Sequence, residues 1–90
     1  MIRLRLRIIG AVQGCFFRAH AQQKAQALGV FGWVANDADG SVAVVAEGPE
    51  NLVNELADWC HSGPSRCMVE KVEITPERYT GEFESFEIRY

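Results

Sequence analysis

The sequence predicts a two-layer α+β domain in which two helices cover one face of an antiparallel sheet. The first observation is the alternation of apolar residues with arginine over residues 2–8, which is the period of a strand with one wet face. The second is a pair of helix-like segments, one at residues 19–28 and one that begins at residue 50. The third is the element order, strand–helix–strand–strand–helix–strand plus a short terminal strand, which is typical of a split βαβ arrangement.

The first predicted strand exposes three arginines, Arg3, Arg5 and Arg7, on the face opposite its apolar side chains. One interpretation is a basic platform for nucleic acid. The other is a solvated sheet face whose arginines pair across strands with acidic residues. We favour the second, because RNA-binding platforms carry aromatic residues on that face and this strand has none. The expected acidic partners are Glu47, Glu84 and Glu87.

The middle of the chain predicts a helix followed by a hairpin. Residues 19–28 are nearly all good helix formers, and a glycine follows them. Two runs rich in β-branched and aromatic residues, 30–35 and 41–47, flank the turn-forming cluster 36–40 and predict two hairpin strands. We expect the first hairpin strand to run beside the strand of residues 2–8.

The second half of the chain predicts one more helix and two strands. The helix begins at Pro49-Glu50 and ends before residue 62, where glycine and proline follow. Residues 67–75 predict a strand, and residues 86–90 predict a final short one. The elements together predict a ferredoxin-like sandwich. Its core is expected to include the large aromatic residues Trp33, Trp59 and Phe86.

The composition indicates one soluble cytoplasmic domain, residues 1–90. The formal net charge of -3 argues against binding to nucleic acid or membranes. No apolar run is long enough to span a membrane, and the basic start of the chain is not that of a signal peptide. The three cysteines are expected to be reduced thiols, and Cys60 and Cys67 are the pair that oxidation could join.

The segment of residues 10–18, GAVQGCFFR, joins the first strand to the first helix and has the features of an anion site. Backbone N–H groups and the positive end of a helix dipole meet at such a turn. Arg18 adds a planar fork that can hold two phosphate oxygens. Strand–glycine–helix turns are also common where nothing binds, so this spacing alone leaves open a surface arginine at a helix start.

Two motifs of this chain resemble those of the acylphosphatase family. The first is the segment of residues 8–18, which ends in Val-Gln-Gly-Cys-Phe-Phe-Arg. The second is Gly-Trp-Val-Ala-Asn at residues 32–36, followed by Gly40, Val42 and Gly48 at the expected offsets. The resemblance covers essentially the whole chain. It implies a small α/β sandwich that hydrolyses the carboxyl–phosphate bond of acyl phosphates, the activity classified as EC 3.6.1.7.

The resemblance also implies roles for individual residues. Arg18 binds the phosphate, and Asn36 holds the attacking water. No metal, cofactor or phosphoenzyme is implied, inorganic phosphate is a product and a competitive inhibitor, and we expect a monomer. The chain departs from the family at Cys15, where valine is usual, and at Phe16, where glycine is frequent. The implied phosphate-binding loop comprises Gln13, Gly14, Cys15, Phe16, Phe17 and Arg18.

Few groups are needed for this reaction, because the acyl group leaves as a carboxylate and phosphoryl transfer requires mainly positioning and charge neutralisation.

Three residues of the two motifs have further interpretations. Phe16 would strain the loop if its position requires a positive φ. Cys15 is interpreted as a small packing residue, although a cysteine near a helix N-terminus can be a nucleophile. Asn36 can also be read as a turn former. The alternative function is a catalytically weak, acylphosphatase-like binding or regulatory module.

Overall fold

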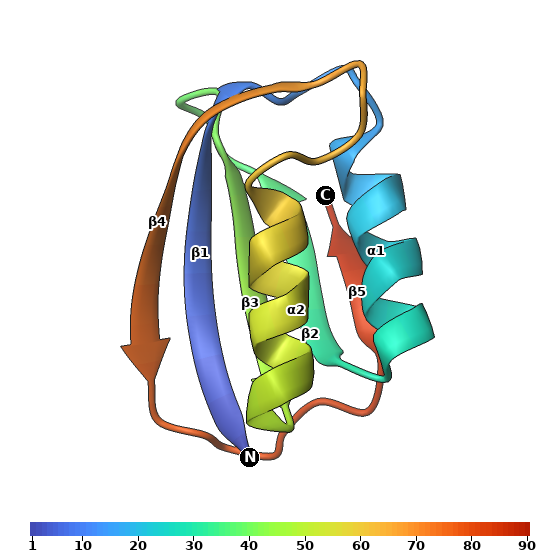
Figure 1. Ribbon diagram of the computed structural model, residues 1–90, viewed down its shortest axis with the longest axis vertical. Coiled ribbons are helices and arrows are strands. Elements are labelled where there is room, and N and C mark those ends of the chain that lie inside the picture. Colours follow the sequence, from blue (N-terminus) through green and yellow to red (C-terminus); the bar gives the residue numbers. More distant parts are fainter.

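The computed structural model describes residues 1–90, which form a five-stranded sheet with both helices on one face (Figure 1). The predicted order of elements and the two-layer arrangement are confirmed. Boundaries differ from the predicted ones by a few residues at the ends. In chain order the elements are β1 (Ile2–Ala11), α1 (Phe17–Leu28), β2 (Phe31–Asn36), β3 (Val42–Gly48), α2 (Glu50–Cys60), β4 (Met68–Glu77) and β5 (Phe86–Arg89).

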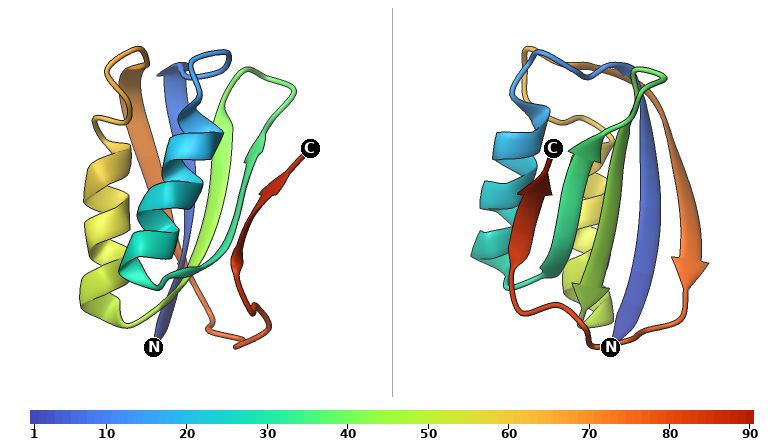
Figure 2. Two further views of the ribbon diagram at one scale, coloured as in Figure 1. Left: turned by 90° about the vertical axis from the view of Figure 1, so that its right-hand side faces the viewer. Right: turned by 180° about the vertical axis from the view of Figure 1, so that it is seen from behind.

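The strand order is β4-β1-β3-β2-β5, and the sheet is mixed. β1 is antiparallel to β3 and β4, and β2 is antiparallel to β3. β5, in contrast, is parallel to β2, with Gly32 opposite Phe86. The prediction of a purely antiparallel sheet was therefore wrong at this edge. After β4 the chain crosses the lower end of the sheet and enters β5 in the same direction as β2 (Figures 1 and 2).

The expectation that β2 runs beside β1 was also wrong, because β3 lies between them. Both β1 and β2 are antiparallel to β3, so they point the same way and their carboxyl ends lie at the same edge of the sheet. α1 connects these two strands and packs over β2 and β5. Its first turn consequently lies near the end of β2 (Figure 2).

The core lies between the sheet and the two helices. β3 is the central strand and is buried along its whole length. Phe86 is buried, and Trp59 packs on the core with its ring 5.4 Å from that of Phe17. Trp33 is an exception to the prediction, because it lies on the open face of the sheet. The guanidinium groups of Arg5 and Arg89 lie over its ring. The alternation of β2 explains this, since Gly32 and Val34 face the helices.

Ion pairs cover the open face of the sheet, as the preferred interpretation of the arginine strand predicts. Arg3 contacts Glu47, Glu77 and Glu82, and Arg5 contacts Glu77. Arg7 pairs with Glu73 and Asp39. Glu84 and Glu87 were wrongly expected as partners, because β5 lies at the edge of the sheet beyond β3 and β2 and not beside β1.

Glu47 is the most buried carboxylate of this network, with 3% of the residue exposed. Burial alone raises the pKa of Glu47. Hydrogen bonds from Thr80, Gly81 and Arg3 outweigh that effect and leave the pKa below its usual range. The backbone N–H of Thr80 donates over 2.9 Å and that of Gly81 over 3.1 Å, so Glu47 holds the segment that follows β4 against the sheet.

Replacing Glu47 by glutamine is expected to lower the free energy of unfolding by about 1–3 kcal/mol at neutral pH, because the donors around it lose a charged acceptor. A carboxylate with a lowered native pKa stabilises the fold above its unfolded pKa, and this contribution is lost as the pH falls through the native pKa. In thermal melts, the difference in melting temperature between Glu47→Gln and the parent should therefore shrink below about pH 4. A difference that stays constant down to about pH 2 would contradict the assigned role of the charge.

A disulfide joins Cys15 to Cys67, with Cα atoms 5.5 Å apart. The prediction of three reduced thiols, and of Cys60 and Cys67 as the pair open to oxidation, was wrong. Cys60 points from α2 into the core, and burial raises the pKa of its thiol to about 12. Cys67 precedes β4, whose first residue pairs with Ala11 at the end of β1, so it meets the loop that follows β1.

Reduction of this disulfide is expected to destabilise the protein by about 4 kcal/mol, because the bridge closes a long loop in the unfolded chain. The two cysteines are 52 residues apart. For a domain of this size the melting temperature should fall by about 15 °C or more. Thermal melts with and without dithiothreitol measure the effect. A double variant with alanine at both positions should melt at the reduced temperature in either buffer, and a reductant effect that persists in it would refute the assignment.

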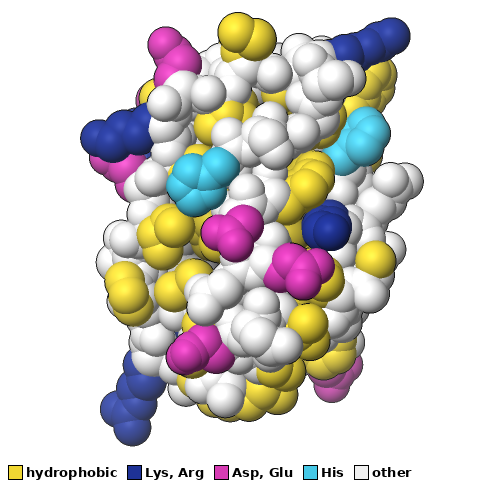
Figure 3. Space-filling view, viewed as in Figure 1, with side chains coloured by type: hydrophobic (Ala, Val, Ile, Leu, Met, Phe, Trp, Pro, Cys, Tyr) yellow, Lys and Arg dark blue, Asp and Glu magenta, His cyan; other side chains and the backbone are white.

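The surface carries no extended region of one charge on the helix side. α1 carries basic residues and no acidic one, whereas α2 carries acidic residues and no basic one. Figure 3 shows the charged side chains of this face separated by polar and apolar ones. Neither helix has the length and apolar character needed to cross a membrane.

Candidate functional site

The loop between β1 and α1 has a tightly folded backbone. Gly14 and Phe16 both have left-handed conformations, with φ values of 76° and 65°. Phe16 is the one non-glycine residue with a positive φ, so the predicted strain at this position is confirmed. It occupies the N-cap position of α1, where no side chain caps the helix. The amides of the first turn therefore have no side-chain acceptor and can bind an anion.

Gln13 fastens this loop to the hairpin between β2 and β3. Its side-chain amide donates to the carbonyl oxygen of Asp37 over 2.8 Å and to that of Ser41 over 2.9 Å. These contacts hold the loop next to the end of β2, where Asn36 is the last residue. The Gln13 side chain thus supports the site, and it is absent from the pocket lining.

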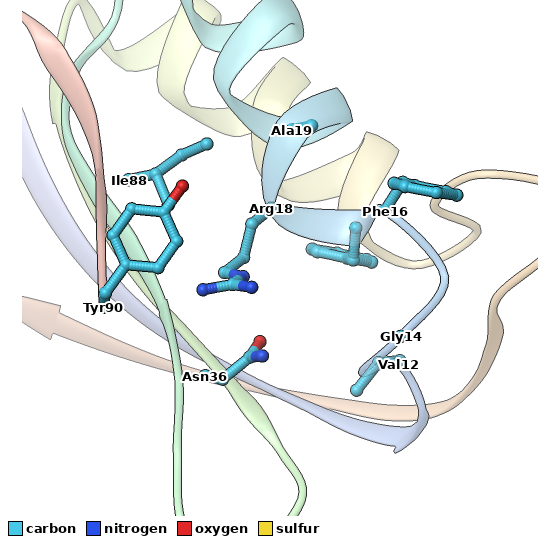
Figure 4. Close-up of a pocket in the computed structure, with 9 residues that line it drawn as sticks. Val12, Gly14, Phe16, Arg18, Ala19, Asn36, Ile88 and Tyr90 are labelled. Atoms are coloured by element: carbon cyan, nitrogen blue, oxygen red, sulfur yellow. The ribbon is translucent and has the colours of Figure 1, made fainter.

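A pocket of about 290 Å³ opens between the loop, the first turn of α1, the end of β2 and the end of the chain (Figure 4). The side chains of Arg18 and Asn36 point toward each other across it. The Arg18 guanidinium lies 4.9 Å from the centre of the Tyr90 ring and pairs with no carboxylate. The pocket is lined by Val12, Gly14, Phe16, Phe17, Arg18, Ala19, Asn36, Ile88 and Tyr90.

The structure thus brings together five of the seven residues that the sequence singled out: Gly14, Phe16, Phe17, Arg18 and Asn36. The other two, Gln13 and Cys15, contribute no side chain to the pocket. Cys15 is bonded to Cys67, so it has no free thiol to act as a nucleophile. The interpretation of Cys15 as a small packing residue missed this disulfide. The sequence did not predict Ile88 and Tyr90 as site residues. Both reach the pocket because β5 pairs parallel to β2, and nothing in the sequence of this four-residue strand indicates that pairing.

The electrostatics of the pocket favour an anion. Arg18 has the one charged side chain in the lining, and the N-terminal end of α1 faces the same space. His20 lies on the next turn, where its Nδ1–H donates to the carbonyl oxygen of Phe16 over 2.9 Å and so holds the loop backbone. No group of three or more histidine, cysteine, aspartate or glutamate side chains is placed to hold a metal ion.

Comparison with known proteins gives one consistent result. The family model described as acylphosphatase matches residues 4–88. An acylphosphatase of Geobacter sulfurreducens is 51% identical over 99% of this chain and 98% of its own. The crystal structure of acylphosphatase from Bacillus subtilis superposes with a TM-score of 0.95 at 33% identity, covering all of both chains. An acylphosphatase structure from Coxiella burnetii has a TM-score of 0.92 at 31% identity, covering 98% of this chain and 92% of its own.

Proposed function

The chain belongs to the acylphosphatase family, and on that premise we propose how its pocket hydrolyses acyl phosphates to a carboxylate and inorganic phosphate. The phosphate lies between the Arg18 guanidinium and the loop of residues 13–18. Arg18 binds two of its oxygens through the planar fork, and the loop amides bind the others. The observation that carries this proposal is the convergence of Arg18, Asn36 and the uncapped first turn of α1 on one pocket.

Asn36 positions the nucleophile. Its side-chain amide can donate to and accept from one water molecule, which orients that water toward phosphorus. The water attacks in line with the leaving oxygen, the P–O bond to the carboxyl group breaks, and the carboxylate departs with its electron pair. Arg18 and the amides neutralise the equatorial oxygens as charge redistributes in the transition state. Because a carboxylate is a good leaving group, no residue needs to protonate it.

The test of this function is turnover of benzoyl phosphate by the purified protein, with inorganic phosphate as the competing ligand. Turnover with competitive inhibition by phosphate is the expected result. A catalytically weak binding module, the alternative, would bind phosphate without appreciable turnover. Binding of neither compound would refute the proposed site.

Activity is expected to persist after exhaustive chelation, because the pocket lining offers no carboxylate, imidazole or thiol to a metal ion. The measurement compares benzoyl phosphate turnover before and after dialysis against EDTA. Loss of turnover that a divalent cation restores would contradict the mechanism.

We further propose that the enzyme acts as a monomer in the cytoplasm and engages neither nucleic acid nor membranes. Two features argue against binding to nucleic acid or membranes. The formal net charge is -3, and each β1 arginine is paired with a carboxylate and so is not free for phosphates of a nucleic acid.

A further inference from the structure

The middle of the loop between β1 and α1, Gly14 to Phe16, is held to the rest of the protein by few contacts. The backbone N–H groups of these three residues donate to no backbone acceptor. On the strand side, the Gln13 side chain binds the hairpin between β2 and β3. On the helix side, the carbonyl oxygen of Phe16 accepts hydrogen bonds from His20. Between these two anchors, the disulfide of Cys15 is the strongest restraint on the loop.

The other end of the disulfide has firm support of its own. Cys67 ends the turn that joins α2 to β4, and its backbone N–H donates to the carbonyl oxygen of Pro64 over 2.9 Å. The next residue is the first of β4 and pairs with Ala11 in β1. The same turn packs on the buried ring of Phe17, since a Cβ at Gly63 would lie 2.8 Å from that ring. The bridge therefore ties the loop to a well-anchored turn at the same end of the molecule (Figure 1).

The disulfide also opposes the relaxation of a strained residue. Phe16 has a φ of 65° and is 61% exposed, so burial of its ring does not offset the strain of the left-handed backbone. Such a conformation persists only where the surrounding structure enforces it. A return of Phe16 to a negative φ would turn Cys15 and Gly14 relative to α1, and the bond to Cys67 prevents that movement. Without the bond, the loop amides would no longer point at the same anion.

A reductant can reach this disulfide from the side of the loop that faces away from Arg18 and Asn36. Phe16, which lines cavities on both sides, points its side chain away from those two residues (Figure 4). Cys15 lines the second cavity and Cys67 does not, so the sulfur of Cys15 is the one open to attack. This cavity has a volume of about 420 Å³ and is lined by Cys15, Phe16, His20, Pro64, Ser65 and Arg66.

We propose that the Cys15–Cys67 disulfide is a redox-sensitive clamp on the phosphate site, which a dithiol opens and reoxidation closes. This inference rests on the proposed function, because it assigns control of the same site. Reduction weakens phosphate binding and leaves the sheet folded. A clamp of this kind suits the proposed cytoplasmic location, where protein disulfides are mostly transient or redox-sensing.

The reaction is a thiol–disulfide exchange. A thiolate of the dithiol attacks Sγ of Cys15, the S–S bond breaks, and Cys67 leaves as a thiolate. The second thiol of the reagent, as its thiolate, then attacks the reagent's own sulfur in the mixed disulfide and releases Cys15. The reagent becomes a cyclic disulfide, so two electrons pass to the protein and the two protons of the reagent end on the two cysteines. Arg66 lines the cavity next to Cys67 in the sequence, and its charge attracts the attacking thiolate.

The test measures the dissociation constant of inorganic phosphate for the parent protein before and after reduction with dithiothreitol, well below the melting temperature of the reduced protein. Reduction should raise this constant about tenfold or more. Reoxidation in air after removal of the reductant should restore it. Amide chemical shifts of the ¹⁵N-labelled protein should differ between the two redox states at residues 13–17 and 61–67 and stay nearly unchanged in β3.

Two variants serve as controls. Cys60→Ala should keep the full response, because Cys60 lies in the core, where burial raises the pKa of its thiol to about 12. The double variant Cys15→Ala/Cys67→Ala should bind phosphate as weakly as the reduced parent in either buffer. Equal phosphate affinities of the oxidised and reduced parent would overturn the inference, and so would unfolding of the whole chain on reduction. Failure of the oxidised parent to bind phosphate would instead refute the proposed function.

The rate of reduction at low ionic strength tests the route of attack. Arg66→Gln should slow reduction by dithiothreitol about two- to threefold, because the thiolate is no longer attracted by the guanidinium. Arg78→Gln is the matched control, since Arg78 is an exposed arginine outside this cavity, and its disulfide should be reduced at the rate of the parent. Equal rates in all three proteins would overturn the assigned route.

Discussion

Arg18→Gln is expected to lower kcat/KM for benzoyl phosphate by about 10³-fold or more, because we propose that the guanidinium neutralises charge that the transition state spreads over the phosphoryl oxygens. Glutamine keeps a similar length and can still donate hydrogen bonds, but it carries no charge and has no planar fork. The variant should also bind inorganic phosphate much more weakly, since Arg18 is proposed to contact the same oxygens in the bound product. Steady-state kinetics and phosphate inhibition measure the two effects.

The fold should survive this substitution, since the Arg18 side chain points into the pocket and pairs with no carboxylate. Arg78→Gln is the matched control, because Arg78 is an exposed arginine that follows β4 and lines no part of this pocket. It should retain the kinetic constants of the parent. An Arg18→Gln variant that keeps most of its activity would show that another group binds the phosphate.

Asn36→Ala is expected to lower kcat by about 10²-fold or more while inorganic phosphate still competes at nearly the original concentration. The reason is that Asn36 is proposed to hold the attacking water and to contribute little to binding of the phosphate itself. Its side chain makes no hydrogen bond within the protein and lies at the exposed end of β2. The melting temperature should therefore change only slightly.

Asn54→Ala is the control for Asn36→Ala, because Asn54 is an exposed asparagine of α2 outside the pocket. Its turnover should match that of the parent. If phosphate affinity falls in step with turnover in Asn36→Ala, Asn36 is a second phosphate ligand and the water-positioning role is wrong. If turnover is unchanged, Asn36 is a turn residue alone.

The local elements of this fold could be predicted because each has a local signal. Alternation in β1, good helix formers in α1 and the turn-forming residues between β2 and β3 all act over a few residues. The pairing of strands, in contrast, depends on contacts between distant parts of the chain. Nothing in the residues 86–89 indicates a parallel partner, and the position of β3 between β1 and β2 follows from packing of the whole sheet. The antiparallel sheet and the expected neighbour of β1 failed for this reason.

The candidate site likewise combines residues that a local signal predicts with residues that only long-range contacts bring into place. Arg18 and Phe16 lie within one short segment, so the sequence could place them at a helix start and anticipate strain at Phe16. Tyr90 reaches the pocket through the parallel pairing of β5, and Cys67 reaches Cys15 through the pairing of β4 with β1. Both are contacts between distant parts of the chain, and a count of cysteines or aromatic residues does not reveal them.

The most direct test of the phosphate site is a titration of the ¹⁵N-labelled protein with inorganic phosphate, followed by amide chemical shifts. We predict the largest shifts at Gly14 to Arg18 and at the Arg18 side chain, with saturation at the concentration that inhibits turnover. The same titration of Arg18→Gln should require much more phosphate. Largest shifts around Arg66, or none in the loop at saturating phosphate, would contradict the proposed site.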